Sequence, residues 1–167
     1  GSLVVGARLY ERAAPRRARV QLEMGGKNAL VVLADADPAE AARIAAAGGF
    51  GLTGQACTAT SRVICDRRIL PAFTDAFEAE SQRFAPGDGL DPDVRMGPVV
   101  SAEQLATDQG YLDLAHNEGV RVLSTARLRE GLFQPPVILA GVGVGDRLAQ
   151  EEIFGPIVAV IAVSGLS

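Results

Sequence analysis

Short apolar runs of strand length alternate with longer runs of helical periodicity along this chain of 167 residues. The sequence predicts strands at residues 18–22, 29–33, 61–65, 120–123, 137–139 and 157–163. It predicts helices at residues 3–14, 38–50, 69–84 and 101–119. Asp37 with Pro38 marks the start of the second helix, and Ser101 with Gln104 resembles a capping box at the start of the fourth. This alternation favours an α/β fold, in which a layered, largely parallel sheet carries helices on both faces. No linker divides the chain into two complete domains.

Composition and charge argue against several classes of partner. The net charge is −4, aromatic residues make up 5% and no basic run is present, so nucleic-acid binding has no electrostatic footprint. No apolar stretch approaches the roughly 20 residues that span a bilayer, so no membrane partner is expected. Cys57 and Cys65 form neither a disulfide framework nor a metal site, which favours a reducing, cytoplasmic setting without a bound metal.

Three glycines after an apolar run, Gly141, Gly143 and Gly145, invite a dinucleotide-binding interpretation. The phosphate-binding fingerprint needs G-x-G-x-x-G at the start of a helix, because backbone amides there surround a pyrophosphate. Here the third glycine comes one residue early and no long amphipathic helix follows. A turn is the better interpretation.

The first candidate for chemistry is Cys57, which follows a glycine break at Gly54 in a loop between a helix and a strand. Loops held by rigid elements often carry catalytic groups. By itself, however, such a cysteine is more often a small buried hydrophobe. A thiol is already a few per cent thiolate at pH 7, so no histidine base is obligatory. The single histidine, His116, is expected to be a solvated helix residue, and Cys65 a core residue.

Two further stretches carry acidic residues beside glycine turns. Glu23 ends a predicted strand before Gly25-Gly26, and desolvation there would raise the pKa of a glutamate and make it a usable base. The alternative is a solvated charge before a plain turn. The pair Glu151-Glu152 precedes Phe154 and a stiff Gly-Pro turn, and by itself could be only a loop that leads into the last strand.

Taken together and in this order, the stretches resemble the aldehyde dehydrogenase superfamily from one end of the chain to the other. The matching positions are the helix start at Gly1-Ser2 and Gly6, the glutamate motif at Glu23, the cysteine motif at Gly54-Gln55 with Cys57, and the nicotinamide-side motif at residues 151–156. The resemblance implies an aldehyde dehydrogenase-like catalytic domain that is incomplete at both ends. Residues 1–24 would be the tail of the coenzyme-binding domain and residues 25–167 most of the catalytic domain.

The resemblance also implies a reaction. Cys57 would attack an aldehyde, hydride would leave for NAD or NADP, and Glu23 would activate the water that hydrolyses the thioester on Cys57. Ser2 would bind the coenzyme phosphates, Glu152 the nicotinamide ribose, and Phe154 would pack near the ring. Lys27 and Asn28 belong to the glutamate motif and are assigned structural roles. A homo-oligomer is expected of the full-length enzyme.

Residues 20–28, 53–62 and 96–105 resemble the α-ketoglutarate semialdehyde (2,5-dioxopentanoate) dehydrogenases, whereas residues 124–133 are shorter than that group's pattern. Succinate semialdehyde or another short aldehyde stays open as substrate. The 167-residue chain alone is expected not to turn over aldehyde. Two alternatives stay open, a coenzyme-independent esterase that uses the same Cys57 and Glu23, and a non-catalytic remnant that serves as an assembly module.

Overall fold

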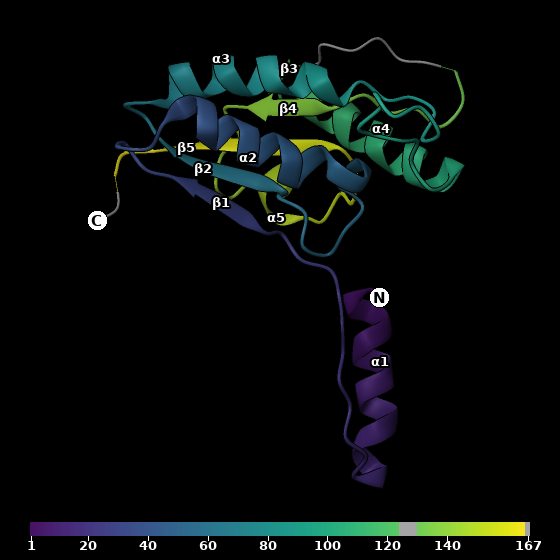
Figure 1. Ribbon diagram of the computed structural model, residues 1–167. Helices are drawn as coiled ribbons and strands as arrows, with labels where there is room; N and C mark the ends of the chain where they lie inside the picture. The colour runs from purple at the N-terminus through teal and green to yellow at the C-terminus, as the bar shows by residue number, and fades with distance from the viewer. Residues whose placement is uncertain (124–129, 166–167) are drawn as a thin grey trace.

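The structure is a computed structural model that describes residues 1–123 and 130–165. Its centre is a five-stranded sheet in the order β1-β2-β5-β4-β3 (Figure 1). The strands are β1 (Ala29–Val32), β2 (Arg62–Asp66), β3 (Arg121–Leu123), β4 (Val137–Ala140) and β5 (Ile157–Val163). Strands β1, β2, β5 and β4 run parallel, and β3 pairs antiparallel with β4 at one edge.

Helices cover both faces of the sheet, which confirms the predicted α/β fold. On one face, α2 (Pro38–Phe50) and α3 (Leu70–Ser81) pack beside each other over a core that includes Val158 and Val160. On the other face, α4 (Ala102–Asn117) and the short α5 (Arg147–Gln150) pack over Ile157, Ala159 and Ile161. Consecutive residues of β5 therefore alternate between two cores, as a strand buried on both faces must.

Local sequence signals explain where the helices begin. Asp37 caps α2 by accepting a 2.9 Å hydrogen bond from the Ala39 N–H, and Pro38 occupies the first turn. Ser101 caps α4 by accepting from the Gln104 N–H at 3.2 Å. The Gln104 side chain does not complete the predicted capping box, because its amide donates to Asp108 and to the Ile153 carbonyl instead.

The predicted strand at residues 18–22 is wrong. The structure assigns no strand there, since no other described strand lies beside it to pair with. The segment instead runs extended along α1 (Leu3–Ala13), and both stand apart from the body that contains the sheet (Figure 1). Several apolar side chains of α1 are left exposed, among them Leu3, at 72% of its surface.

Short elements complete the described chain. The 3₁₀ helices are η1 (Ala14–Arg16), η2 (Gly51–Gly54) and η3 (Gln82–Phe84). The sequence missed α5, because four residues are too few to show a helical period. The glycines at 141, 143 and 145 form a turn as predicted, and Asp146 closes it by accepting from the Gly143 N–H at 2.6 Å. No helix in the described ranges is long and apolar enough to cross a membrane.

Candidate active site

Each of the three chemistry-bearing stretches ends where a strand of the sheet begins. Residues 23–28 lead into β1, the loop with Cys57 leads into β2, and residues 151–156 lead into β5. These three strands are parallel neighbours, with Ala29 paired to Arg62 and Arg62 paired to Ala159. Because parallel strands start at the same edge of a sheet, the three stretches meet there.

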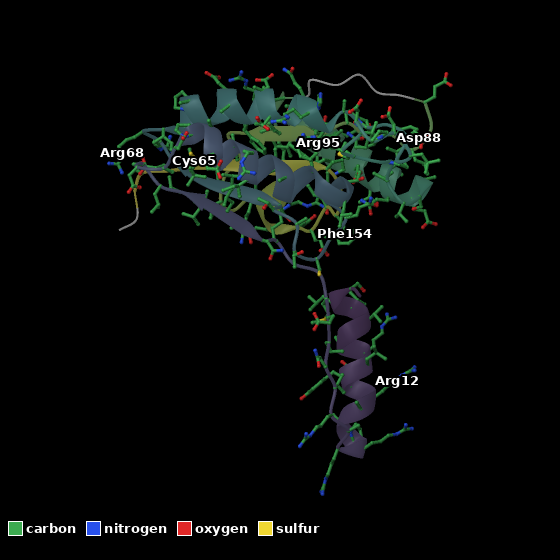
Figure 2. The ribbon with its side chains drawn as sticks, in the orientation of Figure 1. Arg12, Cys65, Arg68, Asp88, Arg95 and Phe154 are labelled. Carbon is green, nitrogen blue, oxygen red and sulfur yellow. The ribbon has the colours of Figure 1, made fainter. Side chains whose placement is uncertain are left out.

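One pocket of about 330 Å³ lies at this edge. Its lining comes from four separate stretches of the chain and consists of Gly1, Ser2, Glu23, Met24, Gly25, Cys57, Glu152 and Phe154. All five residues that the sequence singled out as site residues are among them. A more open hollow of about 460 Å³ along α4 contains none of the five. In Figure 2, Phe154 lies at the side of the body from which the extended segment leaves.

The loop that carries Cys57 has an unusual backbone. Leu52, Thr53 and Gly54 all have positive φ, at 51°, 58° and 67°, which turns the chain sharply after α2. A Cβ on Gly54 would overlap the carbonyl of Gly155, so glycine is required where the two loops touch. The Thr53 hydroxyl donates to the Gly97 carbonyl at 3.2 Å, which fixes the turn to the loop before α4.

A substitution at Gly54 should therefore be costly. Gly54→Ala would place a Cβ on a residue with left-handed φ and push that Cβ into the backbone of Gly155. We expect it to lower the free energy of unfolding by about 2–4 kcal/mol. Gly51 is the matched control, because it has φ −54° and a Cβ there would meet no atom within 4 Å. Gly51→Ala should leave stability unchanged or raise it slightly. Urea unfolding of both variants measures the difference, and equal midpoints would contradict the predicted contact.

Asn28 ties the Cys57 loop to the start of β1. Its side-chain amide donates to the Cys57 carbonyl at 2.7 Å and, at 3.4 Å, to that of Ala59. Its backbone carbonyl accepts from the N–H groups of Ser61 and Arg62 at 3.1 and 3.2 Å. The structural role expected of Asn28 is thus to hold the backbone of the whole Cys57 loop. The Cys57 side chain itself is exposed.

Glu23 lines the pocket but differs from expectation in its surroundings. It is exposed and lies in the extended segment, so the burial at an apolar strand end that was expected to desolvate it is absent. Its carboxylate accepts a 3.1 Å hydrogen bond from the Gln21 side chain. Glu23 and Cys57 line the same pocket, and among the described residues no hydrogen bond joins them.

The adjacent acidic residues Glu151 and Glu152 have opposite surroundings. The Glu151 carboxylate forms two hydrogen bonds with Arg147, at 2.7 and 2.9 Å, and accepts from the Tyr111 hydroxyl at 3.0 Å. Arg147 and Tyr111 lower the pKa of Glu151. Glu152 faces the pocket instead, where it accepts from the Gly26 N–H at 3.1 Å. Extended backbone at Glu151 directs consecutive side chains to opposite sides.

Gly25 and Phe154 also line the pocket. A Cβ on Gly25 would overlap the Glu152 carboxylate, so only glycine leaves that carboxylate in its present place. Phe154 has φ 62°, rare for a bulky residue, and the residue is 38% exposed. Such backbone strain is typical of functional sites.

Ser2 joins the pocket from the start of α1. Its hydroxyl caps the helix by accepting from the Val5 N–H at 3.3 Å. The Gly1 carbonyl accepts from the Gly25 N–H at 3.1 Å, which ties the helix start to the glycine turn. A helix N-terminus with a serine cap presents backbone N–H groups and a positive dipole end that suit an anion.

Residues assigned no chemistry lie elsewhere. Cys65 is fully buried, and burial together with Asp66 raises the pKa of its thiol to about 11, so it is a core residue as predicted. His116 is exposed on α4, with its Nδ1 2.9 Å from the Leu112 carbonyl, and does not line the pocket. The glycine turn after β4 follows the carboxyl end of that strand, opposite to the edge that carries the site.

Two supporting residues were not predicted from the sequence. Asp108 on α4 is fully buried against Gly155, and this burial raises the pKa of its carboxyl to about 6, against the opposing hydrogen bond from Gln104. Together Asp108 and Gln104 support the loop that presents Glu152 and Phe154. A buried aspartate on a helix gives no periodic signal, so only the tertiary structure reveals it.

Comparison with known proteins gives a consistent result. The model of the aldehyde dehydrogenase family matches residues 1–167. The alpha-ketoglutarate semialdehyde dehydrogenase of Haloferax volcanii is 42% identical, over 98% of this chain and 35% of that protein. The 2,5-dioxopentanoate dehydrogenase of Saccharolobus solfataricus is 41% identical, over 99% and 35%. These relatives carry the names of the group that residues 20–28, 53–62 and 96–105 resemble; residues 124–129, which depart from its pattern, lie outside the described residues.

Solved structures agree in fold. An indole-3-acetaldehyde dehydrogenase in complex with NAD⁺ superposes with a TM-score of 0.93 at 33% identity, covering 99% of this chain and 34% of that chain. A betaine aldehyde dehydrogenase from Staphylococcus aureus, also in complex with NAD⁺, gives 0.91 at 32% identity and the same coverage. The chain spans about a third of the length of these relatives.

Proposed function

Because this chain belongs to the aldehyde dehydrogenase family, we propose that it supplies the nucleophile, the general base and the nicotinamide-side contacts for oxidation of an aldehyde to a carboxylic acid with NAD or NADP. The observation that carries the proposal is the single pocket that gathers Cys57, Glu23, Glu152, Phe154 and Ser2. Four separate stretches of sequence contribute to it. Stability of the fold alone does not require these residue types to lie together at one edge of the sheet.

Cys57 acts as the nucleophile. Its thiolate forms a bond to the carbonyl carbon, and negative charge develops on the aldehyde oxygen. Within the described part of the chain the Cys57 N–H donates no hydrogen bond, so it is free to stabilise that charge. Asn28 holds the Cys57 carbonyl and thereby the orientation of this peptide. Loss of hydride from the adduct leaves a thioester on Cys57.

Glu23 acts as the general base. Glu23 lines the same pocket as Cys57, and no hydrogen bond in the described part of the chain joins its carboxylate to Cys57. The carboxylate takes a proton from a water molecule as the water attacks the thioester, which releases the acid and the Cys57 thiolate. The hydrogen bond from Gln21 orients the Glu23 carboxylate before the reaction.

The residues that line the pocket suit separate parts of a nicotinamide dinucleotide. Gly25 has no Cβ where one would displace Glu152, so the Glu152 carboxylate is available to ribose hydroxyls. Phe154 offers an aromatic face to a planar ring, and Ser2 with the first turn of α1 suits the phosphates. Bound NAD or NADP supplies the acceptor for the hydride.

We further propose a substrate and a domain division. Residues 1–24 are assigned to the end of the coenzyme-binding domain and residues 25–167 to the catalytic domain, supported by the separation of α1 from the sheet in Figure 1. Relatives named for α-ketoglutarate semialdehyde favour a semialdehyde as substrate. With a third of the relatives' length, the 167-residue chain alone is expected to form no NADH from aldehyde, which absorbance at 340 nm measures.

Alkylation by iodoacetamide tests the proposal at the nucleophile. In the natural protein that contains these residues, Cys57 should react at least about a hundredfold faster than Cys65, because burial protects Cys65 and raises the pKa of its thiol. Peptide mass spectrometry over time measures both rates. Equal, slow rates at both cysteines would favour the non-catalytic module. Ester hydrolysis that proceeds without NAD or NADP, in place of aldehyde oxidation, would favour the esterase.

A further inference from the structure

Lys27 is the single lysine among the 16 basic residues of this chain, and the other 15 are arginines. It follows the Gly25-Gly26 turn, two residues before β1, and does not line the pocket that contains Cys57. Its Nζ is buried and has no hydrogen-bond partner within the ranges 1–123 and 130–165. A buried ammonium without such a partner costs folding free energy, so packing alone does not account for it.

The groups around Lys27 determine which side chains its ammonium attracts. It lines a small cavity of about 10 Å³ together with Glu152, Phe154, Gly54 and other residues of the Cys57 loop. The carboxylate of Glu152, and to a lesser degree that of Glu151, attracts the ammonium, whereas the guanidinium of Arg62 repels it. Asp108 lies against Gly155, which also lines this cavity. Glu152 therefore has the Gly26 N–H on one oxygen and a buried positive charge behind it.

We propose that Lys27 is a positioning residue for Glu152: its ammonium attracts the carboxylate toward the glycine turn, so that coenzyme affinity depends on the charge of Lys27. The inference rests on the proposed function, in which Glu152 contacts the nicotinamide ribose. Glu151 cannot substitute for Glu152 here, since Arg147 and Tyr111 already bind its carboxylate.

The charge of Lys27 is sensitive to pH. Burial, and then Arg62, lower the pKa of Lys27 to about 8, and the two glutamates only partly oppose this. The ammonium is therefore present at pH 7 and is lost as the pH rises through 8. Between pH 8 and the ordinary lysine pKa of 10.5 the unfolded chain binds more protons than the folded one, so stability rises with pH across this window. Below pH 8 the cost of the buried charge is fully present.

Coenzyme binding by the natural protein that contains these residues provides the functional test. At pH 7, Lys27→Met should raise the Kd for NAD or NADP about tenfold, equivalent to about 1.4 kcal/mol. In the wild type the Kd should rise as the pH passes through 8. Lys27→Arg keeps its charge at every pH, so the Kd should stay within about threefold of wild type at pH 7 and lose that pH dependence. Arg83→Met, which removes a half-exposed cation elsewhere, is the control and should change nothing.

Thermal unfolding separates positioning from packing. Lys27→Met removes a buried charge, so its Tm at pH 7 should equal or exceed that of wild type, with a smaller difference at pH 10. A lowered Tm would show that Lys27 is needed for packing and would overturn the proposal. An unchanged Kd in Lys27→Met would also overturn it.

Nuclear magnetic resonance tests the Lys27–Glu152 interaction without coenzyme. With ¹³Cε-labelled lysine, the Lys27 signal is the one missing from the Lys27→Arg spectrum. Glu152→Gln should lower the pKa of Lys27 further, because it removes the stronger attracting carboxylate, and Glu151→Gln should lower it less. Equal effects, or none, would contradict the proposal. Should the wild type bind no coenzyme, the proposed function fails, and this titration still decides whether Lys27 and Glu152 interact.

Discussion

Replacing Cys57 with alanine is expected to lower kcat/KM for aldehyde oxidation by at least about 10⁴-fold, because no other group in the pocket can form the covalent adduct. The remaining lining residues are carboxylates, glycines, a serine that caps α1, a methionine and a phenylalanine. Of these, only Ser2 carries a hydroxyl, and that hydroxyl accepts a hydrogen bond from the Val5 N–H. Steady-state NADH formation by the natural protein measures the loss.

Cys65→Ala is the matched control for Cys57→Ala. It removes the second thiol from a fully buried position in β2, so it should lower stability and leave kcat/KM within about twofold of wild type. Coenzyme should still bind to Cys57→Ala with a Kd close to that of wild type, since Ser2, Glu152 and Phe154 are unchanged. Substantial aldehyde oxidation by Cys57→Ala would remove the basis of the proposed mechanism.

Glu23→Gln is expected to lower steady-state turnover by about 10²–10⁴-fold while leaving the first turnover largely intact. The amide has the shape of the carboxylate and cannot take a proton from water. In the proposed mechanism Glu23 acts only on the water that attacks the thioester, so acylation of Cys57 does not depend on Glu23. The thioester should therefore accumulate, and a burst of one NADH per site should precede slow turnover.

Stopped-flow absorbance measures the burst, and intact-protein mass spectrometry detects the acylated Cys57. Glu11→Gln on the exposed part of α1 is the matched control, and it should have normal turnover because Glu11 lies outside the pocket. If Glu23→Gln lost both the burst of NADH and the steady-state turnover, Glu23 would be needed for the acylation of Cys57. Normal turnover by that variant would assign the base to another group.

Much of the local structure could be predicted from the sequence. Asp37 with Pro38 and Ser101 with Gln104 marked helix starts that the structure confirms, because caps depend on residues only two or three positions apart. The strand predicted at residues 18–22 was one exception, besides the missed helix α5. An apolar run becomes a strand only if another strand lies beside it, and no local pattern shows whether one does.

The candidate site divides in the same way. The residue types and their order along the chain pointed to Cys57, Glu23 and the stretch from Glu151 to Phe154. Two features of the site depend on the tertiary structure. Hydrogen bonds to Arg147 and Tyr111 engage Glu151 and leave Glu152 facing the pocket. Glu23 is exposed, where the sequence led us to expect burial at the end of a strand.

The sequence by itself determined which residues can do chemistry and that each chemical stretch directly precedes an apolar strand. The tertiary structure decided that β5, the last of those strands, lies against β2, which places Glu152 and Phe154 in one pocket with Cys57. It also decided that the ammonium of Lys27 is buried and that Lys27 and Glu152 line one small cavity. The physical reason is range: caps and turns depend on neighbours within a few residues, whereas strand order and the burial of a charge depend on packing between residues about a hundred positions apart.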